Sequence, residues 1–187
     1  MATHVGLLRG INVGGRNKVA MPALRDVVAS LGHTGVTTYI ASGNVLFSTP
    51  QTGTGELAQA LEAAITSAFG ISVPVVVVSR DELAEILRGN PYRDEPDDRR
   101  VHVVFLSGEP TSDLLDRIAN VQAAAAAKGS RDLVTAAGRV MYLHTPDGFG
   151  TSELAQRLLR VLEKPGKATA RNWATATKLL ALCDGQG

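Results

Sequence analysis

Hydrophobic positions in residues 1–90 alternate between helical and strand spacing along the chain. Apolar residues three and four apart predict a helix that has Pro22 in its first turn and ends before Gly32. The same spacing predicts a second helix over 54–69. Runs rich in β-branched and aromatic residues predict four strands, at 3–9, 37–41, 44–48 and 73–79. The resulting order, strand-helix-strand-strand-helix-strand, is that of a ferredoxin-like unit.

Residues 91–187 repeat this order. The pattern predicts strands and helices at 101–106, 113–127, 133–136, 140–144 and 153–162, then a short strand at 168–170 and a closing helix over 175–182. The hairpin around Gly43 resembles the hairpin around Gly138, since each has a glycine between two apolar runs. We therefore predict an α+β fold of two ferredoxin-like βαββαβ halves, 1–90 and 91–187, with an extra C-terminal helix.

The two predicted halves are joined by the most charged and proline-marked stretch of the chain, residues 89–100. Such a stretch is typical of a solvated linker. Apolar residues occupy both faces of the first strand, Val5 and Leu7 on one face and Leu8 on the other. This pattern predicts that the second face of each sheet is covered, either by the other half packed as one unit or by a second subunit. The oligomeric state stays open.

Composition removes several classes of function. The chain has 187 residues, 19 Lys and Arg against 18 Asp and Glu, and a net charge of +1, so bulk charge does not indicate binding to nucleic acid or to membranes. Its single cysteine, Cys183, cannot form an internal disulfide, which is typical of a reducing compartment. There is no secretory signal pattern and no apolar run of membrane-spanning length. We expect a cytoplasmic protein.

Motifs of common catalytic chemistry are missing from the sequence. Gly10 and Gly15 have the spacing of a phosphate loop, but Arg16 and Asn17 follow where that motif needs Lys and Ser or Thr. The histidines are scattered without metal-ligand spacing, and no serine nucleophile motif occurs. We therefore assign no catalytic residue, no metal and no cofactor, and whether the protein is an enzyme stays open.

One cluster of polar residues remains as a candidate binding site. In the predicted sheet, the segment 10–18 and the turn at 42–44 emerge at the same end, which brings together Arg9, Asn12, Asn17, Lys18, Ser42 and Asn44. Backbone N–H groups of Gly14 and Gly15, the following helix N-terminus and the cations favour a small anion such as a phosphate, a nucleotide or a carboxylate. The alternative for this segment is an exposed loop without a ligand.

A second basic cluster lies near the C-terminus. Arg171 and Lys178 are candidates to join the anion site, and Thr175 is a candidate cap of the last helix. The alternative function is a nucleic-acid-binding or protein-interaction module. Recognition of RNA by a ferredoxin-like sheet needs exposed aromatic residues on the first and third strands. The first half has only Phe47 there, and the second half has Phe105 and Tyr142, which we expect to be needed in the core.

Several of these segments together resemble a known bacterial family, domain of unknown function 1697. The resemblance rests on LLRGINVGG at 7–15, SGNV at 42–45, PDG at 146–148 and RNW at 171–173. It implies a duplicated ferredoxin-like protein of the cytoplasm and no established activity. Glu153 departs from the lysine that the family commonly has there, so we leave 151–154 out of the predicted site.

Overall fold

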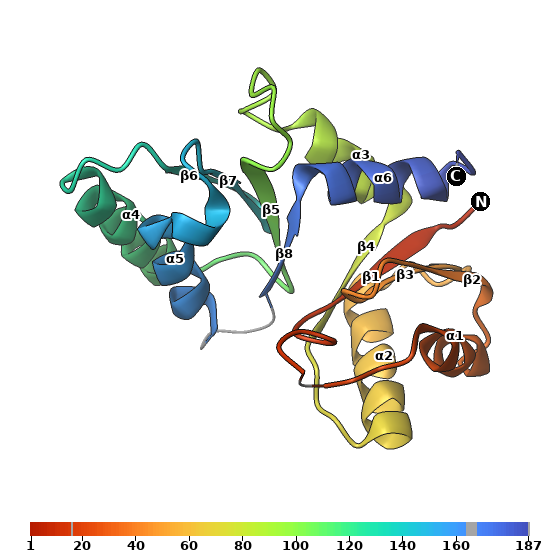
Figure 1. The fold of residues 1–187 in the computed structure, drawn as a ribbon. Helices are drawn as coiled ribbons and strands as arrows, with labels where there is room; N and C mark the ends of the chain where they lie inside the picture. The colour runs from red at the N-terminus through yellow and green to blue at the C-terminus, as the bar shows by residue number, and fades with distance from the viewer. Residues whose placement is uncertain (16, 164–167, 187) are drawn as a thin grey trace. The chain divides into compact units, whose positions relative to one another are not determined.

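Two four-stranded antiparallel sheets, each with helices packed against it, form the computed structural model of the chain (Figure 1). The structure describes residues 1–15, 17–163 and 168–186. It divides into two compact units: unit 1 is Met1–Glu85 with Thr177–Gly187, and unit 2 is Ile86–Ala176. No helix in these described residues has the length and apolar character needed to cross a membrane.

Unit 1 has the predicted βαββαβ order. Its elements are β1 (His4–Leu8), α1 (Met21–Ser30), β2 (Thr34–Tyr39), β3 (Asn44–Ser48), α2 (Thr54–Phe69) and β4 (Val75–Ser79), after which α3 (Arg80–Arg88) begins. The strands lie in the order β2-β3-β1-β4, and all neighbours are antiparallel. Val5 of β1 lies opposite Leu46 of β3, so the predicted pairing of the first and third strands is confirmed.

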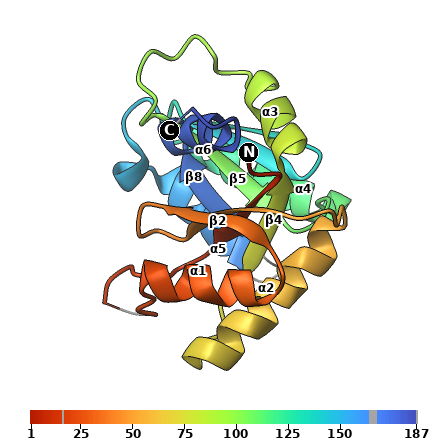
Figure 2. The same ribbon diagram turned by 90° about the vertical axis from the view of Figure 1, so that its right-hand side faces the viewer.

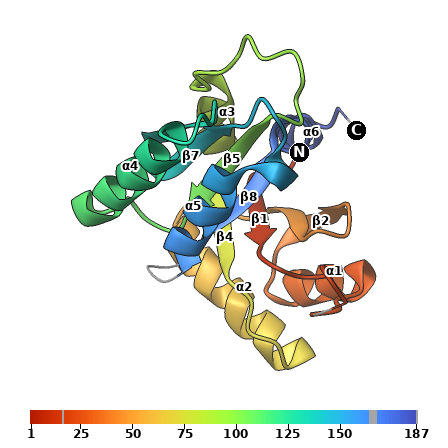
Figure 3. The same cartoon turned by 60° about the vertical axis from the view of Figure 1, so that its left-hand side comes forward.

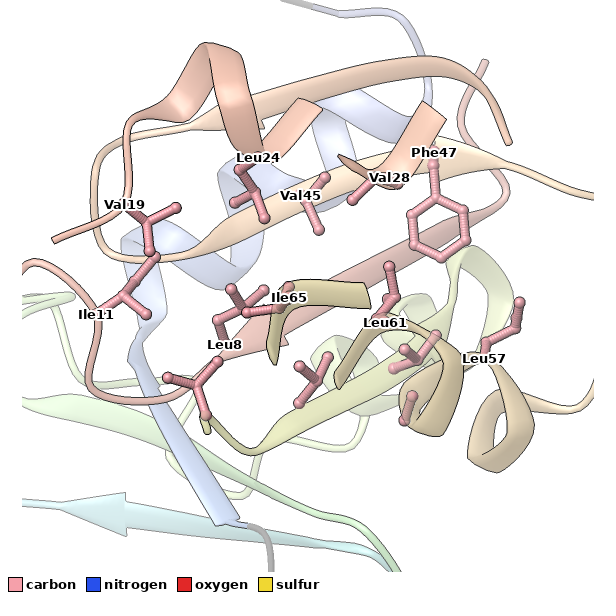
Figure 4. Packing of buried hydrophobic residues seen from close by; sticks show 14 residues of the cluster. Leu8, Ile11, Val19, Leu24, Val28, Val45, Phe47, Leu57, Leu61 and Ile65 are labelled. Atoms are coloured by element: carbon pink, nitrogen blue, oxygen red, sulfur yellow. The ribbon is translucent and has the colours of Figure 1, made fainter. Parts of the chain in front are cut away.

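The core of unit 1 lies between one face of this sheet and the helices α1 and α2. Figure 2 shows the two helices side by side beneath the sheet. In Figure 4, Leu24 and Val28 of α1 and Leu61 of α2 point toward Val45 and Phe47 of β3. Leu24, Val28 and Leu61 are among the apolar positions that recur three and four residues apart in the sequence. This spacing explains why the two segments form helices here.

The opposite face of the same strands is also buried. Val5, Leu7, Leu46, Val76 and Val78 are each at most 2% exposed. Strands that are buried on both faces explain the near-continuous apolar runs of β1 and β4. That the other half or a second subunit covers this face stays a prediction.

Unit 2 repeats the same topology. Its elements are β5 (Val101–Leu106), α4 (Ser112–Ala126), β6 (Leu133–Ala137), β7 (Val140–His144), a short 3-10 helix (Phe149–Thr151), α5 (Glu153–Glu163) and β8 (Ala168–Asn172), and α6 (Trp173–Cys183) follows. The strand order is β6-β7-β5-β8. Figure 3 shows α4 and α5 side by side, and they share a core with β5 and β7. The predicted duplicated ferredoxin-like fold is confirmed.

Two element ends differ from the prediction. Asn172 Oδ1 accepts a hydrogen bond from the Thr175 backbone N–H at 2.8 Å. Asn172 therefore caps the N-terminus of α6, and the prediction that Thr175 caps this helix was wrong. Strand β2 starts at Thr34 instead of residue 37. That the chain consists of two halves, residues 1–90 and 91–187, stays a prediction.

Candidate functional site

The segment 9–15 lies against the turn between β2 and β3. The Leu8 N–H donates to the Gly43 carbonyl at 2.8 Å, and Asn12 Nδ2 donates to the Ala41 carbonyl at 2.9 Å. Segments that are about 30 residues apart in sequence are thus joined by direct hydrogen bonds, as the strand topology requires. We call residues 9–15, 17–18 and 40–44 together the loop cluster.

Two asparagine side chains hold the first part of the loop cluster closed. Asn12 Nδ2 also donates to the Val19 carbonyl, and Asn12 Oδ1 accepts from the Val19 N–H, both at 2.9 Å. Asn17 Nδ2 donates to the Gly10 carbonyl at 3.1 Å. Both asparagines have a left-handed backbone, with φ of 54° and 47°, a conformation that asparagine adopts more readily than most residues. Their amide nitrogens therefore serve the loop itself.

Ser42, Gly43 and Asn44 form the second part of the loop cluster. The fully buried Asn44 donates from Nδ2 to the Tyr39 carbonyl at 3.0 Å and to Ser42 Oγ at 3.2 Å. Gly43 has a φ of 88°, and a Cβ there would lie 2.8 Å from the Leu8 Cβ. A glycine is required at this position because a side chain would be both strained and in collision.

Gly14 and Gly15 lie at the exposed tip of the segment. Their φ values are 58° and 77°, and an added Cβ would meet nothing within 4 Å. These glycines are needed for the backbone turn and not for space. The turn carries a short run of backbone that a small ligand can approach closely.

Positive charge gathers in the sequence around the loop cluster. Residues 1–55 contain four arginines and lysines but a single acidic residue, Asp26. Arg9 is partly exposed and Lys18 is exposed. Arg25 donates to Thr38 Oγ1 at 2.9 Å. The first turn of α1 has no acidic residue and its N-cap, Ala20, makes no side-chain hydrogen bond, so no carboxylate of that turn offsets the positive end of the helix dipole.

Arg171 and Lys178 have different surroundings. Arg171 belongs to unit 2 and is nine-tenths buried, and it donates to Thr169 Oγ1 at 2.7 Å and to the Ala170 carbonyl at 2.8 Å. Burial lowers the pKa of its guanidinium to about 10. Lys178 lies on the part of α6 that belongs to unit 1 and is partly buried. Their contribution to an anion site stays a prediction.

Sequence reasoning missed one residue of the loop cluster. Ile40 has a φ of 49° and is 49% exposed. A β-branched residue with positive φ is a genuine conformational outlier. No sequence signal indicates it, since isoleucine at the end of an apolar run predicts a strand residue.

Histidines elsewhere serve as packing groups, with His4 and His33 buried and His102 partly buried. In unit 1, His4 and His33 both stack on Phe47, with ring centroids 5.8 and 4.6 Å away. In unit 2, His102 stacks on Phe149 at 3.9 Å. Burial lowers the pKa of each of these imidazoles, in His102 to about 4. Within the part of the chain that the structure describes, no three His, Cys, Asp or Glu side chains are placed to hold a metal ion.

Unit 1 also contains an open cavity of about 550 Å³. It is lined by residues of four short segments, among them His4, Thr49, Arg80 and Cys183. Arg80 forms an ion pair with Asp184 at 2.8 Å, and burial raises the pKa of the Cys183 thiol to about 11. The thiol is therefore protonated at neutral pH and is a poor nucleophile.

Comparison with known proteins identifies the family but no activity. The family described as "Protein of unknown function (DUF1697)" matches residues 1–142, and the chain belongs to it. A solved structure, that of the conserved bacterial protein SP0830 from Streptococcus pneumoniae, is similar over 98% of this chain and 99% of its own, with 23% sequence identity and a TM-score of 0.74. That similarity shows a shared fold. No curated protein matches the chain.

Proposed function

We propose that this member of the DUF1697 family binds a small anion at the loop cluster. The observation that carries the proposal is the set of Asn12 hydrogen bonds, which fix the 9–18 segment on the β2–β3 turn. A loop that is held in place loses less conformational entropy when a ligand binds. Arg9 and Lys18 lie in that segment, and Gly14 and Gly15 turn its exposed tip.

The chemistry of the loop cluster favours negative charge. Hydrogen bonds from charged donors contribute about 1.5–3 kcal/mol each. The positive end of α1 adds a smaller attraction to an anion near its first turn. Together these groups support micromolar affinity at best after the costs of association. No residue of the cluster is assigned an acid, base or nucleophile role, so the proposal is binding and not catalysis.

Calorimetric titration with inorganic phosphate tests the proposal. The double variant Arg9→Ala/Lys18→Ala should bind phosphate at least about tenfold more weakly, the loss expected for one charge-assisted hydrogen bond. A matched control is Arg117→Ala/Arg160→Ala, which removes two exposed cations from helices of unit 2. The control should bind like the wild type. Absence of phosphate binding by the wild type would refute the proposal.

The remaining sequence predictions extend the same titration. Arg171→Ala and Lys178→Ala should each weaken phosphate binding if those cations join the site.

A single-stranded oligonucleotide tests the alternative function, a nucleic-acid-binding module. A cytoplasmic location is supported by the unpaired, buried Cys183, and cell fractionation tests it.

A further inference from the structure

Two exposed apolar side chains belong to the loop cluster. Val13 is 63% exposed and Ile40 is 49% exposed. Val13 follows Asn12, and Ile40 precedes Ala41, whose carbonyl accepts the Asn12 Nδ2 hydrogen bond at 2.9 Å. The two residues therefore flank the same hydrogen bond, one on each side of the contact between the two segments.

Folding does not account for the isoleucine at position 40. Its backbone has a φ of 49°, which strains a β-branched residue and suits asparagine or glycine. About half of its side chain is exposed, so its contribution to the core is small. Strained residues cluster at binding sites, where the surrounding structure holds them in place.

The charge of the loop cluster selects among possible occupants. A second copy of this chain would bring Arg9 and Lys18 near the same cations of its partner, and like charges repel. Two apolar side chains also offer far less area than the roughly 800 Å² per partner of a stable protein interface. A small molecule that carries both an anionic group and an apolar body matches the charge and the size of this surface.

We infer that the ligand is a small organic anion whose apolar or aromatic body packs on Val13 and Ile40 while its charged group lies at Arg9 and Lys18. This inference rests on the proposed function and adds the class of ligand to it. The inferred ligand is therefore an aryl or alkyl phosphate or carboxylate and not an inorganic ion. The apolar body gains affinity because it is removed from water against the two side chains.

A paired titration tests the inference with inorganic phosphate and phenyl phosphate as probes. The wild type should bind phenyl phosphate about tenfold more tightly, the gain expected for burying part of one ring. The double variant Val13→Ser/Ile40→Asn should bind the two probes equally. The matched control, Leu115→Ser/Leu133→Asn, changes two exposed apolar residues of unit 2 and should keep the tenfold preference.

The outcomes separate this inference from the proposed function. Equal binding of both probes by the wild type overturns the inference alone, as does a preference that survives in Val13→Ser/Ile40→Asn. Failure of both probes to bind overturns the inference and the proposed function together. Sedimentation of the wild type as a dimer that Val13→Ser/Ile40→Asn dissociates would show that a second copy covers the two side chains, and this result too overturns the inference.

Discussion

The side-chain amide of Asn12 pairs with the backbone of Val19 as a neighbouring strand would. Its Oδ1 accepts from the Val19 N–H and its Nδ2 donates to the Val19 carbonyl, each at 2.9 Å. The same Nδ2 donates to Ala41 across the loop cluster. One amide therefore connects the two ends of the 12–19 segment and also fixes that segment to the β2–β3 turn.

Replacement of Asn12 by aspartate should destabilise unit 1. The carboxylate has nearly the same shape but cannot donate to the carbonyls of Val19 and Ala41. Loss of these two hydrogen bonds in a partly exposed site should lower the free energy of unfolding by about 1–3 kcal/mol. Urea denaturation measures the change. Asn120→Asp, at an exposed position of α4, is the matched control, and an equal loss there would contradict this role of Asn12.

Much of the fold follows from the spacing of apolar residues. The helix predicted at 54–69 begins and ends at those residues, because Leu57, Leu61 and Ile65 form one buried stripe. Strand order then places the 9–18 segment beside the turn at 42–44, and the Asn12 hydrogen bond to Ala41 lies at that junction. Topology rather than any single motif made this part of the loop cluster predictable.

Side-chain roles within the loop cluster were not predictable in the same way. The sequence contains Asn12, Asn17 and Asn44, but which atoms they face depends on backbone conformation that local propensities do not determine. Their amides hold the loops together. Arg171 illustrates the same difficulty, since its position in a strand makes it nine-tenths buried although its charge suggests a surface site.

Replacement of Ile40 by asparagine should stabilise the protein. Asparagine accepts a φ of 49° at low cost, whereas a β-branched residue is strained there. We expect the free energy of unfolding to rise by about 1 kcal/mol, since the relief of strain outweighs the small loss of apolar burial. Thermal denaturation measures it. Thr37→Asn, an exposed change within β2, should destabilise slightly, and a stabilising effect there would argue against strain as the cause.

Acid should weaken unit 2 through His102. Its ring stacks on Phe149 and its Nδ1 is buried without a hydrogen-bond partner, and burial lowers its pKa from 6.5 to about 4. Above pH 6.5 the ring is neutral in the folded and unfolded states. As the pH falls toward 4 the unfolded chain binds the proton first, so up to about 3 kcal/mol of stability is lost over this window.

His102→Leu tests this pH dependence. Urea denaturation of the variant between pH 7 and pH 4 should show a smaller loss of stability than the wild type. A remainder should persist, because burial also lowers the pKa of His4 and His33. An NMR titration in which the His102 ring becomes protonated near pH 6.5 in the folded protein would contradict the prediction.

The contact between Glu95 and His144 should fasten residues 89–100 to the sheet of unit 2. His144 Nε2 lies 2.7 Å from Glu95 Oε2, and the Tyr92 ring stacks on the His144 ring with centroids 5.1 Å apart. Tyr92 also forms a hydrogen bond with Thr135 Oγ1 of β6 at 2.8 Å. The sequence predicted a solvated linker here, and these contacts show that two of its side chains, Tyr92 and Glu95, pack on β6 and β7.

Glu95→Gln should expose the pH dependence of this contact. The hydrogen bond to His144 and, next, the backbone N–H of Asp97 lower the pKa of the Glu95 carboxyl below 4.5. A lowered carboxyl pKa stabilises the folded state above pH 4.5, and this stabilisation disappears as the pH falls through the folded-state pKa. The variant should therefore be less stable than the wild type at pH 7 and more rapidly cleaved by protease within 89–100, and the stability difference should shrink as the pH falls below 4.5. Glu109→Gln, at an exposed position, should show neither effect. A stability difference for Glu95→Gln that stays constant from pH 7 to pH 3 would show that the carboxylate charge does not hold the segment in place.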